Sequence, residues 1–431
     1  MKTKPTIFNT IYFVKSCFIM LFMFFVAFSY ANGLVYRTQI FDSTIKTLQI
    51  GREGEKYSSN LLELNSSDVL KIKFDQLSHE SHAYSYKVIH CNADWTLSNI
   101  SSNEYLEGFT TANISDYQLS SATTFLYTHY RFELPNNDLK LKISGNYVAL
   151  IYEDNQSEKP VAQVCFSVCE PKVSVNHTLR ANTDIELNGR YQQIDFDVLL
   201  NGVSVQNPQT ELKVIVRQNN RFDNEVFGVQ PTYMGGSKLS YTNNKALIFE
   251  GGNEFHSFDI SSVYAASRGV DRIKYMQPHY EVFLTQDKIQ TSKVYNHEFD
   301  ANGKFVVNYQ ESMGNSDTEG DYMYVNFMLP TKEPYFDGQI YVGGDFNQNL
   351  LNEDSKIKFD FNAGMYFYRT LLKQGGYNYQ YRFLQKNNSK ATVERVDGSY
   401  WQTNNEYGVF VYYRPIGARY DRLIGVKVFD K

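Results

Sequence analysis

The segment that decides the fold class is Val69–Phe74, which reads VLKIKF, together with Tyr84–His90, which reads YSYKVIH. In both segments, apolar or aromatic residues alternate with polar ones, so every second side chain points to the same side of an extended chain. Such a segment buries one face and leaves the other in contact with solvent, as half-buried strands of antiparallel sheets do. The two segments therefore predict β-strands.

The same alternation recurs along the rest of the chain. Further predicted strands are Leu139–Ile143, Glu211–Arg217, Tyr322–Phe327 and Gly376–Phe383. Clusters of turn-forming residues separate them, for example Asn65–Asp68 and Asp300–Gly303. We find no convincing amphipathic helix longer than about two turns. Short strands with regular turn signals predict an all-β protein, built from tandem immunoglobulin-like or early-set β-sandwich domains.

The N-terminus carries the features of a secretory signal peptide. Three lysines precede the apolar run Cys17–Phe28, and Ser29-Tyr30-Ala31 then offers small residues at the −3 and −1 positions of a cleavage site. The run is about a dozen residues long, whereas a membrane-spanning helix needs about 20. We therefore expect residues 1–31 to be a cleaved signal peptide, and we expect no direct membrane span in the mature chain.

Two positions in the mature chain look like domain boundaries. At Cys169-Glu170-Pro171-Lys172 a predicted strand ends at a proline-containing step, and a new alternating run follows. At Glu311–Asp321 (ESMGNSDTEGD) the chain is acidic and almost without apolar residues, as a linker would be. These positions predict an N-terminal β-sandwich at 32–170, a middle β domain at 171–310 and an early-set-like C-terminal β-sandwich at 311–431.

The net charge narrows the class of partner. The full chain carries −5, and removing residues 1–31 takes away three lysines and no acidic residue, which leaves −8. A mildly acidic chain without a basic block is not expected to bind nucleic acid or to be held electrostatically on anionic lipid.

Three cysteines remain after cleavage: Cys91, Cys165 and Cys169. An odd number cannot all pair within the chain. Cys165 and Cys169 would be about 13 Å apart on one strand, which is too far for a disulfide. Two readings stay open: Cys91 forms a disulfide with one of the other two, or all three are small buried apolar residues.

The search for catalytic and metal-binding patterns gives little. His79-Glu80-Ser81-His82 is one residue short of the spacing of a helical zinc protease and lies in a predicted loop. We find neither a nucleophile elbow nor a Walker A sequence. We therefore expect no catalytic residues, no metal, no cofactor and no small-molecule substrate. An enzyme whose catalytic groups converge from distant loops remains an alternative.

The C-terminal part resembles early-set and glycogen-binding modules. The similarity lies in Tyr341–Asn347 (YVGGDFN) and Gly375–Phe383 (GGYNYQYRF), which resemble the G-x-F-N-x-W turn and the G-x-Y-x-Y-x-F strand of those modules. Asn349 stands where the tryptophan of that turn is expected, so the stacking platform for a sugar is missing. A carbohydrate-binding accessory protein of the periplasm or cell surface is nevertheless the main alternative function.

Taken in order, several segments resemble one family, the type IX secretion system plug proteins of the Bacteroidota. The matching segments are Ile45–Leu48, Arg52–Gly54, Val88–Trp95, Glu104–Phe109, Tyr127–Tyr130, Ser144–Tyr147, Gln218–Asn224, Gly252–Phe255 and Tyr412–Gly425. The similarity extends over nearly all of the mature chain. The sequence departs from the family pattern at Phe222, where tryptophan is expected, and at Asn349.

The resemblance implies a periplasmic protein without enzymatic activity, associated with the outer membrane through the translocon. It would bind a large outer-membrane β-barrel and close its periplasmic end until substrate engages. Tyrosine and arginine are favoured at protein interfaces, so two polar, aromatic loops are candidates for the contacts. The candidate residues are Arg221, Phe222, Asp223, Tyr413, Arg414 and Tyr420, although each could equally serve a local role in a turn or at a core edge.

Overall fold

The computed structural model describes residues 34–57, 60–154, 159–291, 294–311 and 314–431, and the predicted signal peptide lies outside these ranges. Within them the regular structure is almost entirely β-strand, which confirms the all-β prediction. No helix of the described ranges is long and apolar enough to cross a membrane. The short helical segments are α2 (Ser102–Tyr105), α3 (Pro208–Glu211), η2 (Lys245–Leu247), α4 (Ser316–Glu319), η3 (Asp345–Asn347) and α5 (Glu394–Asp397).

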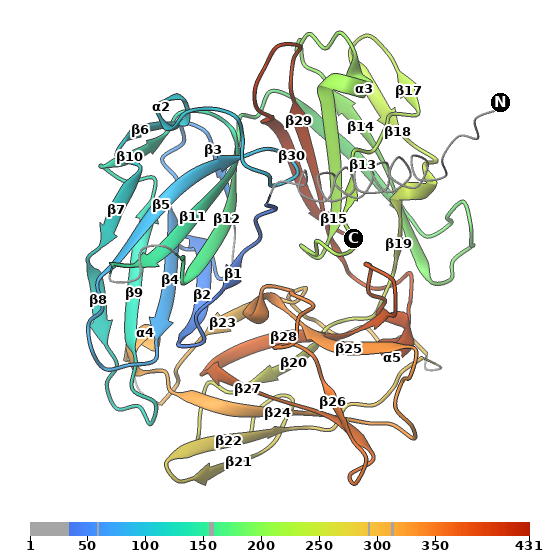
Figure 1. Cartoon of the computed structure of the whole chain (residues 1–431). Helices are drawn as coiled ribbons and strands as arrows, with labels where there is room; N and C mark the ends of the chain where they lie inside the picture. Colours follow the sequence, from blue (N-terminus) through green and yellow to red (C-terminus); the bar gives the residue numbers. More distant parts are fainter. Residues whose placement is uncertain (1–33, 58–59, 155–158, 292–293, 312–313) are drawn as a thin grey trace, which may run out of the picture.

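The strands form three groups around a common centre (Figure 1), which we call the first, second and third domains. The first domain comprises β1 to β12. Its larger sheet contains β1 (Gln39–Ile40), β12 (Ala162–Cys169), β11 (Gly145–Glu153), β5 (Tyr84–Cys91) and β7 (Thr111–Ile114), with β3 (Leu61–Glu63) parallel to β12. Its second sheet contains β2 (Ile45–Arg52), β4 (Leu70–Gln76), β9 (Thr128–Leu134) and β8 (Asp116–Leu119), and β6 (Leu106–Gly108) pairs with β10 (Leu139–Leu141).

The decisive segments of the sequence form two of these strands. β4 buries Leu70, Ile72 and Phe74, while β5 buries Tyr84 and Tyr86 against them. The two strands belong to different sheets, so the alternating residues of each fill the space between the sheets.

The second domain combines the middle of the chain with its last two strands. One sheet contains β13 (Ser174–Arg180), β14 (Tyr191–Leu199), β18 (Lys238–Tyr241) and β17 (Tyr233–Met234), with β19 (Ile248–Glu250) also paired to β14. The other contains β16 (Val226–Phe227), β15 (Leu212–Gln218), β29 (Glu406–Tyr413) and β30 (Arg422–Asp430).

The third domain comprises β20 to β28 and is inserted between β19 and β29. In one sheet, β28 (Gly375–Gln385) pairs with β20 (His256–Asp259), β23 (Phe305–Val307) and β25 (Gly338–Gly343). The other sheet contains β21 (Val270–Met276), β22 (His279–Leu284), β24 (Tyr322–Pro330), β27 (Met365–Lys373) and β26 (Lys358–Asp360).

These sheets differ from the predicted domains 171–310 and 311–431. The pairing of β15 with β29 runs from Leu212 opposite Tyr413 to Gln218 opposite Tyr407, so the end of the chain completes the second domain. Local periodicity identifies strands but not their distant partners, which explains the error. The predicted linker Glu311–Asp321 also has a structural role, because the Asp321 carboxylate accepts the backbone N–H groups of Thr124 and Phe125 in the first domain.

Candidate functional site at the domain junctions

Most of the predicted contact residues lie at junctions between the domains. At the junction of the first and second domains, the Asp421 side chain is fully buried. It accepts the backbone N–H of Ala93 at 2.9 Å and pairs with Lys213 at 2.9 Å. Arg414 pairs with the same carboxylate at 2.8 Å and donates to the side chain of Asn92. Because a buried charge is costly unless it is paired, these contacts fix the β29–β30 loop on the first domain.

The two predicted tyrosines of this loop have different roles. Tyr420 packs edge-on against His90, with ring centroids 5.4 Å apart. His90 is buried with its Nδ1 2.9 Å from the hydroxyl of Ser98, and burial lowers the pKa of His90 to about 4. Its imidazole is therefore neutral near pH 7 and serves packing. Tyr413 donates to the carbonyl of Ser204 at 2.9 Å, within the second domain.

Arg221 and Asp223 join the second domain to the third. The Arg221 guanidinium donates to both oxygens of Asp223, at 3.0 and 2.6 Å, and to the carbonyl of Ala391 at 2.9 Å. The Asp223 carboxylate also accepts the backbone N–H of Ala391 at 3.0 Å. Burial opposes ionisation of Asp223, but the Arg221 guanidinium lowers its pKa to about 2. Arg221 is 3% exposed, so it does not offer the surface contact expected of it.

The third junction, between the first and third domains, centres on Asp75. This buried carboxylate accepts the Lys373 ammonium at 2.6 Å and the Tyr322 hydroxyl at 2.7 Å, and His129 Nδ1 lies 2.6 Å from it. Lys373 also donates to the carbonyl of Asp317 at 2.6 Å. Burial alone would raise the pKa of Asp75, but the Lys373 ammonium and the His129 imidazole hold it below its usual value.

A cavity of about 600 Å³ lies where the three domains meet. Phe222, the remaining predicted residue, lines it with its ring between two guanidiniums, those of Arg37 and Arg217, each 4.1 Å from the ring centroid. Such contacts are cation–π interactions. The third domain contributes Phe305 and Asn349 to the same cavity.

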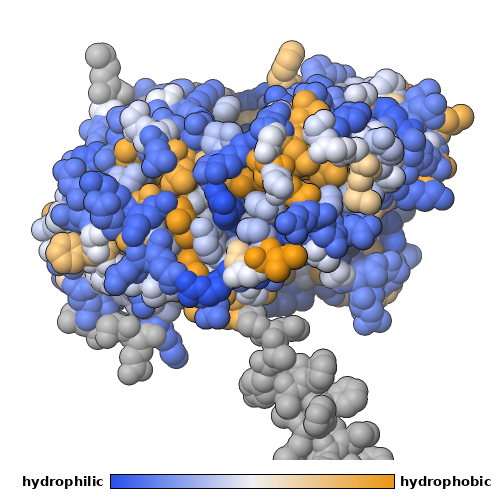
Figure 2. All heavy atoms as spheres, turned by 90° about the horizontal axis from the view of Figure 1, so that it is seen from above, coloured by the Kyte–Doolittle hydropathy of each residue, from blue (hydrophilic) through white to orange (hydrophobic). Residues whose placement is uncertain are grey.

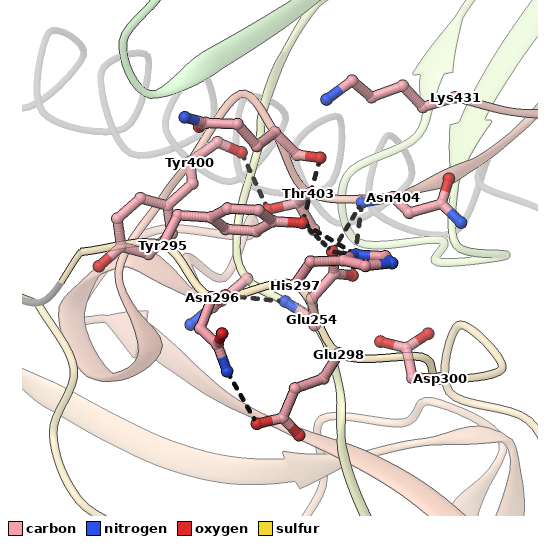
Figure 3. A network of polar contacts seen from close by, with 12 residues as sticks. Glu254, Tyr295, Asn296, His297, Glu298, Asp300, Tyr400, Thr403, Asn404 and Lys431 are labelled. Atoms are coloured by element: carbon pink, nitrogen blue, oxygen red, sulfur yellow. Dashed lines mark hydrogen bonds and ion pairs between the residues drawn. The ribbon is translucent and has the colours of Figure 1, made fainter.

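Further polar contacts join the segment around Tyr295, in the third domain, to the chain that enters and leaves that domain (Figure 3). The Glu254 side chain accepts the hydroxyl of Tyr295 and the backbone N–H of Asn404, the latter at 3.2 Å, and its Oε1 lies 3.3 Å from Nδ1 of His297. The arrangement anchors the segment around Tyr295 against the chain that leads into β29. In the described part of the chain, no group of three or more His, Cys, Asp and Glu side chains is placed to hold a metal ion.

The three cysteines and the histidine pair of the first domain make contacts that stabilise the fold. Cys91, Cys165 and Cys169 are free and buried, as the second of the two readings expected. Burial raises the pKa of Cys165 and Cys169 to about 12. His82 contacts Glu153, with Nδ1 2.7 Å from the carboxylate, and His79 contacts the carbonyl of Ser120 at 3.0 Å.

The sequence prediction names residues at two of the three junctions, as contacts with an external partner. It missed the Asp75 junction, whose members are far apart in the sequence. The segment Tyr127–Tyr130, which contains His129, was the only signal for it, through the family resemblance.

Comparisons with known proteins agree with this arrangement. Residues 45–170 match the family model of the first domain of type 9 secretion system plug proteins. The chain is also similar to a hypothetical protein from Parabacteroides merdae whose crystal structure is known, with a TM-score of 0.90 and 38% sequence identity. That similarity covers 92% of this chain and 100% of the other. No curated protein matches the chain. On these findings, the chain belongs to the type 9 secretion system plug protein family.

Proposed function

We propose that this protein binds the outer-membrane β-barrel of the type IX translocon and closes its periplasmic end until a substrate engages. The observation that carries the proposal is the match of residues 45–170 to the first domain of plug proteins. On the same basis, and from the predicted signal peptide, we place the protein in the periplasm and assign it no catalytic activity.

The three junctions support a role as a stopper. Each junction contains a buried carboxylate with a cationic partner. Asp421 pairs with Arg414 and accepts the backbone N–H of Ala93 in the first domain. Asp223 pairs with Arg221 and accepts the backbone N–H of Ala391 in the third domain, and Asp75 pairs with Lys373 across the junction itself. A body joined on all three sides resists hinge motion, because opening any junction would expose a buried charge. A protein that closes a pore needs this resistance, since a flexible one would let solute pass.

The β29–β30 loop is the surface that we propose for the barrel contact. Ile416 lies in this loop and is 81% exposed, while Arg414 and Asp421 hold the loop on either side of it. A rigidly held apolar side chain can act as an anchor without an entropic cost of ordering. Figure 2 shows apolar side chains in separate patches among hydrophilic ones on the face seen from above. Such a surface suits a contact that can be released.

The carbohydrate alternative lacks its expected platform. Asn349, which replaces the tryptophan, lines the central cavity and bonds to Arg382 and Asp345, each at 2.7 Å. The third domain does expose Phe361, but this ring stands edge-on to Phe359, at 80°, and the two do not form a flat surface for a sugar.

The proposal is tested by an affinity pull-down from detergent-solubilised outer membrane with the tagged chain. We expect a large β-barrel protein in the eluate. The Ile416→Asp variant should recover much less of it, whereas Ile185→Asp should not change recovery, because Ile185 is also exposed (56%) but lies between β13 and β14, outside the β29–β30 loop. Recovery of glycan alone, without a barrel, would overturn the proposal.

A further inference from the structure

Two edge strands, β2 of the first domain and β23 of the third, line the same groove at the boundary of these domains. β2 is the outermost strand of its sheet and pairs only with β4; in the described residues no strand pairs with its other edge. β23 likewise pairs only with β28. A groove of about 310 Å³ lies between them, lined by Gln49–Arg52 of β2 and by all three residues of β23. Unpaired strand edges present backbone N–H and C=O groups that can pair with another chain.

The groove continues into the central cavity. Both are lined by Ile50, Arg52 and Phe305. The cavity adds apolar surface from Leu48 and Phe410 beside the ring of Phe222. A segment lying along β2 would therefore place alternate side chains in an apolar space, as strand addition requires.

The charge of the lining favours an acidic segment. The groove and the cavity together are lined by seven cationic and five anionic side chains, an excess of two positive charges in a chain whose net charge is −5. Most of these cations have a carboxylate partner, such as Lys73 with Asp317 at 2.6 Å. Arg37 differs: in the described residues its guanidinium forms no ion pair, donates to the carbonyl of Tyr36 at 2.8 Å and lies over Phe222.

We propose that this groove binds an extended segment of a partner protein, which adds as a strand to the free edge of β2. The segment would place apolar side chains against Leu48 and Phe222 and a carboxylate on Arg37. The proposal goes beyond the plugging role, because it concerns a peptide site between the first and third domains and does not depend on the barrel contact at Ile416.

The probe for the test is a fluorescein-labelled, ten-residue peptide of alternating valine and aspartate. Fluorescence anisotropy with the purified chain measures its affinity. Two comparison peptides have the same length: one alternates valine and lysine, and the other repeats the acidic sequence with alternate amides N-methylated. Both should bind at least about tenfold more weakly, since the first lacks the carboxylates and the second cannot complete the strand hydrogen bonds.

Variants locate the site. Arg37→Gln should weaken binding of the acidic peptide about tenfold. Arg272→Gln should not, because Arg272 is an exposed residue of β21 that pairs with Asp271 and lines neither the groove nor the cavity. Both variants should keep the thermal unfolding midpoint of the parent chain. If Arg37→Gln does not fold, hydrogen exchange on the parent chain replaces it, and bound peptide should slow exchange of amides within Gln49–Arg52.

Three results would overturn the proposal: no binding of the acidic peptide, equal binding of the N-methylated peptide, or binding without protection of the β2 amides. Equal binding of the lysine peptide would overturn the requirement for acidity. These results do not depend on the pull-down. Failure of the peptide to bind would leave the plugging proposal unaffected, and recovery of the barrel protein would not support the peptide site.

Discussion

Replacing Lys373 with methionine tests whether the junction of the first and third domains is held by buried charge. The Lys373 side chain is 1% exposed, as is that of Asp75, and the two are 2.6 Å apart. Methionine keeps most of the volume but, among the described residues, leaves Asp75 with only Tyr322 and His129 as hydrogen-bond partners. Breaking a buried ion pair by removing one partner costs about 3–5 kcal/mol, and we expect a loss of unfolding free energy in this range.

The assay is urea unfolding at pH 7, followed by tryptophan fluorescence. The chain has two tryptophans, Trp95 in the first domain and Trp401 beyond α5, so the signal reports on separate parts of the molecule. The matched control is Lys140→Met, because Lys140 and its partner Glu107 are both more than half exposed, and such a pair contributes about 0–1 kcal/mol. A loss at Lys373 no larger than that of the control would refute the reasoning.

Three further predictions follow from the junctions and the cysteines. The unfolding free energy of the parent chain relative to His90→Gln should fall by about 3 kcal/mol between pH 7 and 4. The reason is that His90 binds a proton below about pH 6.5 in the unfolded chain but only below about pH 4 in the folded one. Burial also raises the pKa of Asp300 and Asp345 to about 6, which stabilises the folded chain as the pH falls and so opposes the effect of His90 on total stability. The measurement is therefore the difference in unfolding free energy between parent and variant, from urea unfolding at each pH. A difference that does not change with pH would contradict the prediction. Arg221→Lys should lower the unfolding free energy by about 1–3 kcal/mol in the same urea assay, because lysine cannot bond both oxygens of Asp223. An unchanged unfolding midpoint would show that the paired hydrogen bonds between Arg221 and Asp223 do not stabilise the junction. A thiol reagent should label Cys91, Cys165 and Cys169 only after denaturation, as mass spectrometry can show; rapid labelling of the native chain would mean that these thiols are accessible.

Local sequence patterns identified the strands well, for a clear physical reason. Alternation reflects one buried face, and the predicted segment Gly376–Phe383 lies within β28, whose residues Tyr377, Tyr379, Tyr381 and Phe383 are buried. Alternation carries no information on which strand lies beside which. The pairing of β15 with β29 joins residues about 200 apart, so the true limits of the second and third domains could not be read from composition.

The loops chosen as partner contacts show a second limit. Tyrosine and arginine are favoured at interfaces, and Arg221, Arg414 and Tyr420 do lie at interfaces, as does Asp223 of the same loop as Arg221. These interfaces join domains of one chain. The same residue types can stabilise contacts between domains as well as contacts with a partner protein. Only burial in the folded structure separates the two uses.

The plugging role is tested most directly by the conductance of the type IX translocon barrel reconstituted in a planar lipid bilayer. The account predicts that adding the purified chain on the periplasmic side lowers the conductance of the open barrel, and that Ile416→Asp does so only at higher concentration. A conductance that stays unchanged at saturating concentrations of the folded parent chain would contradict it.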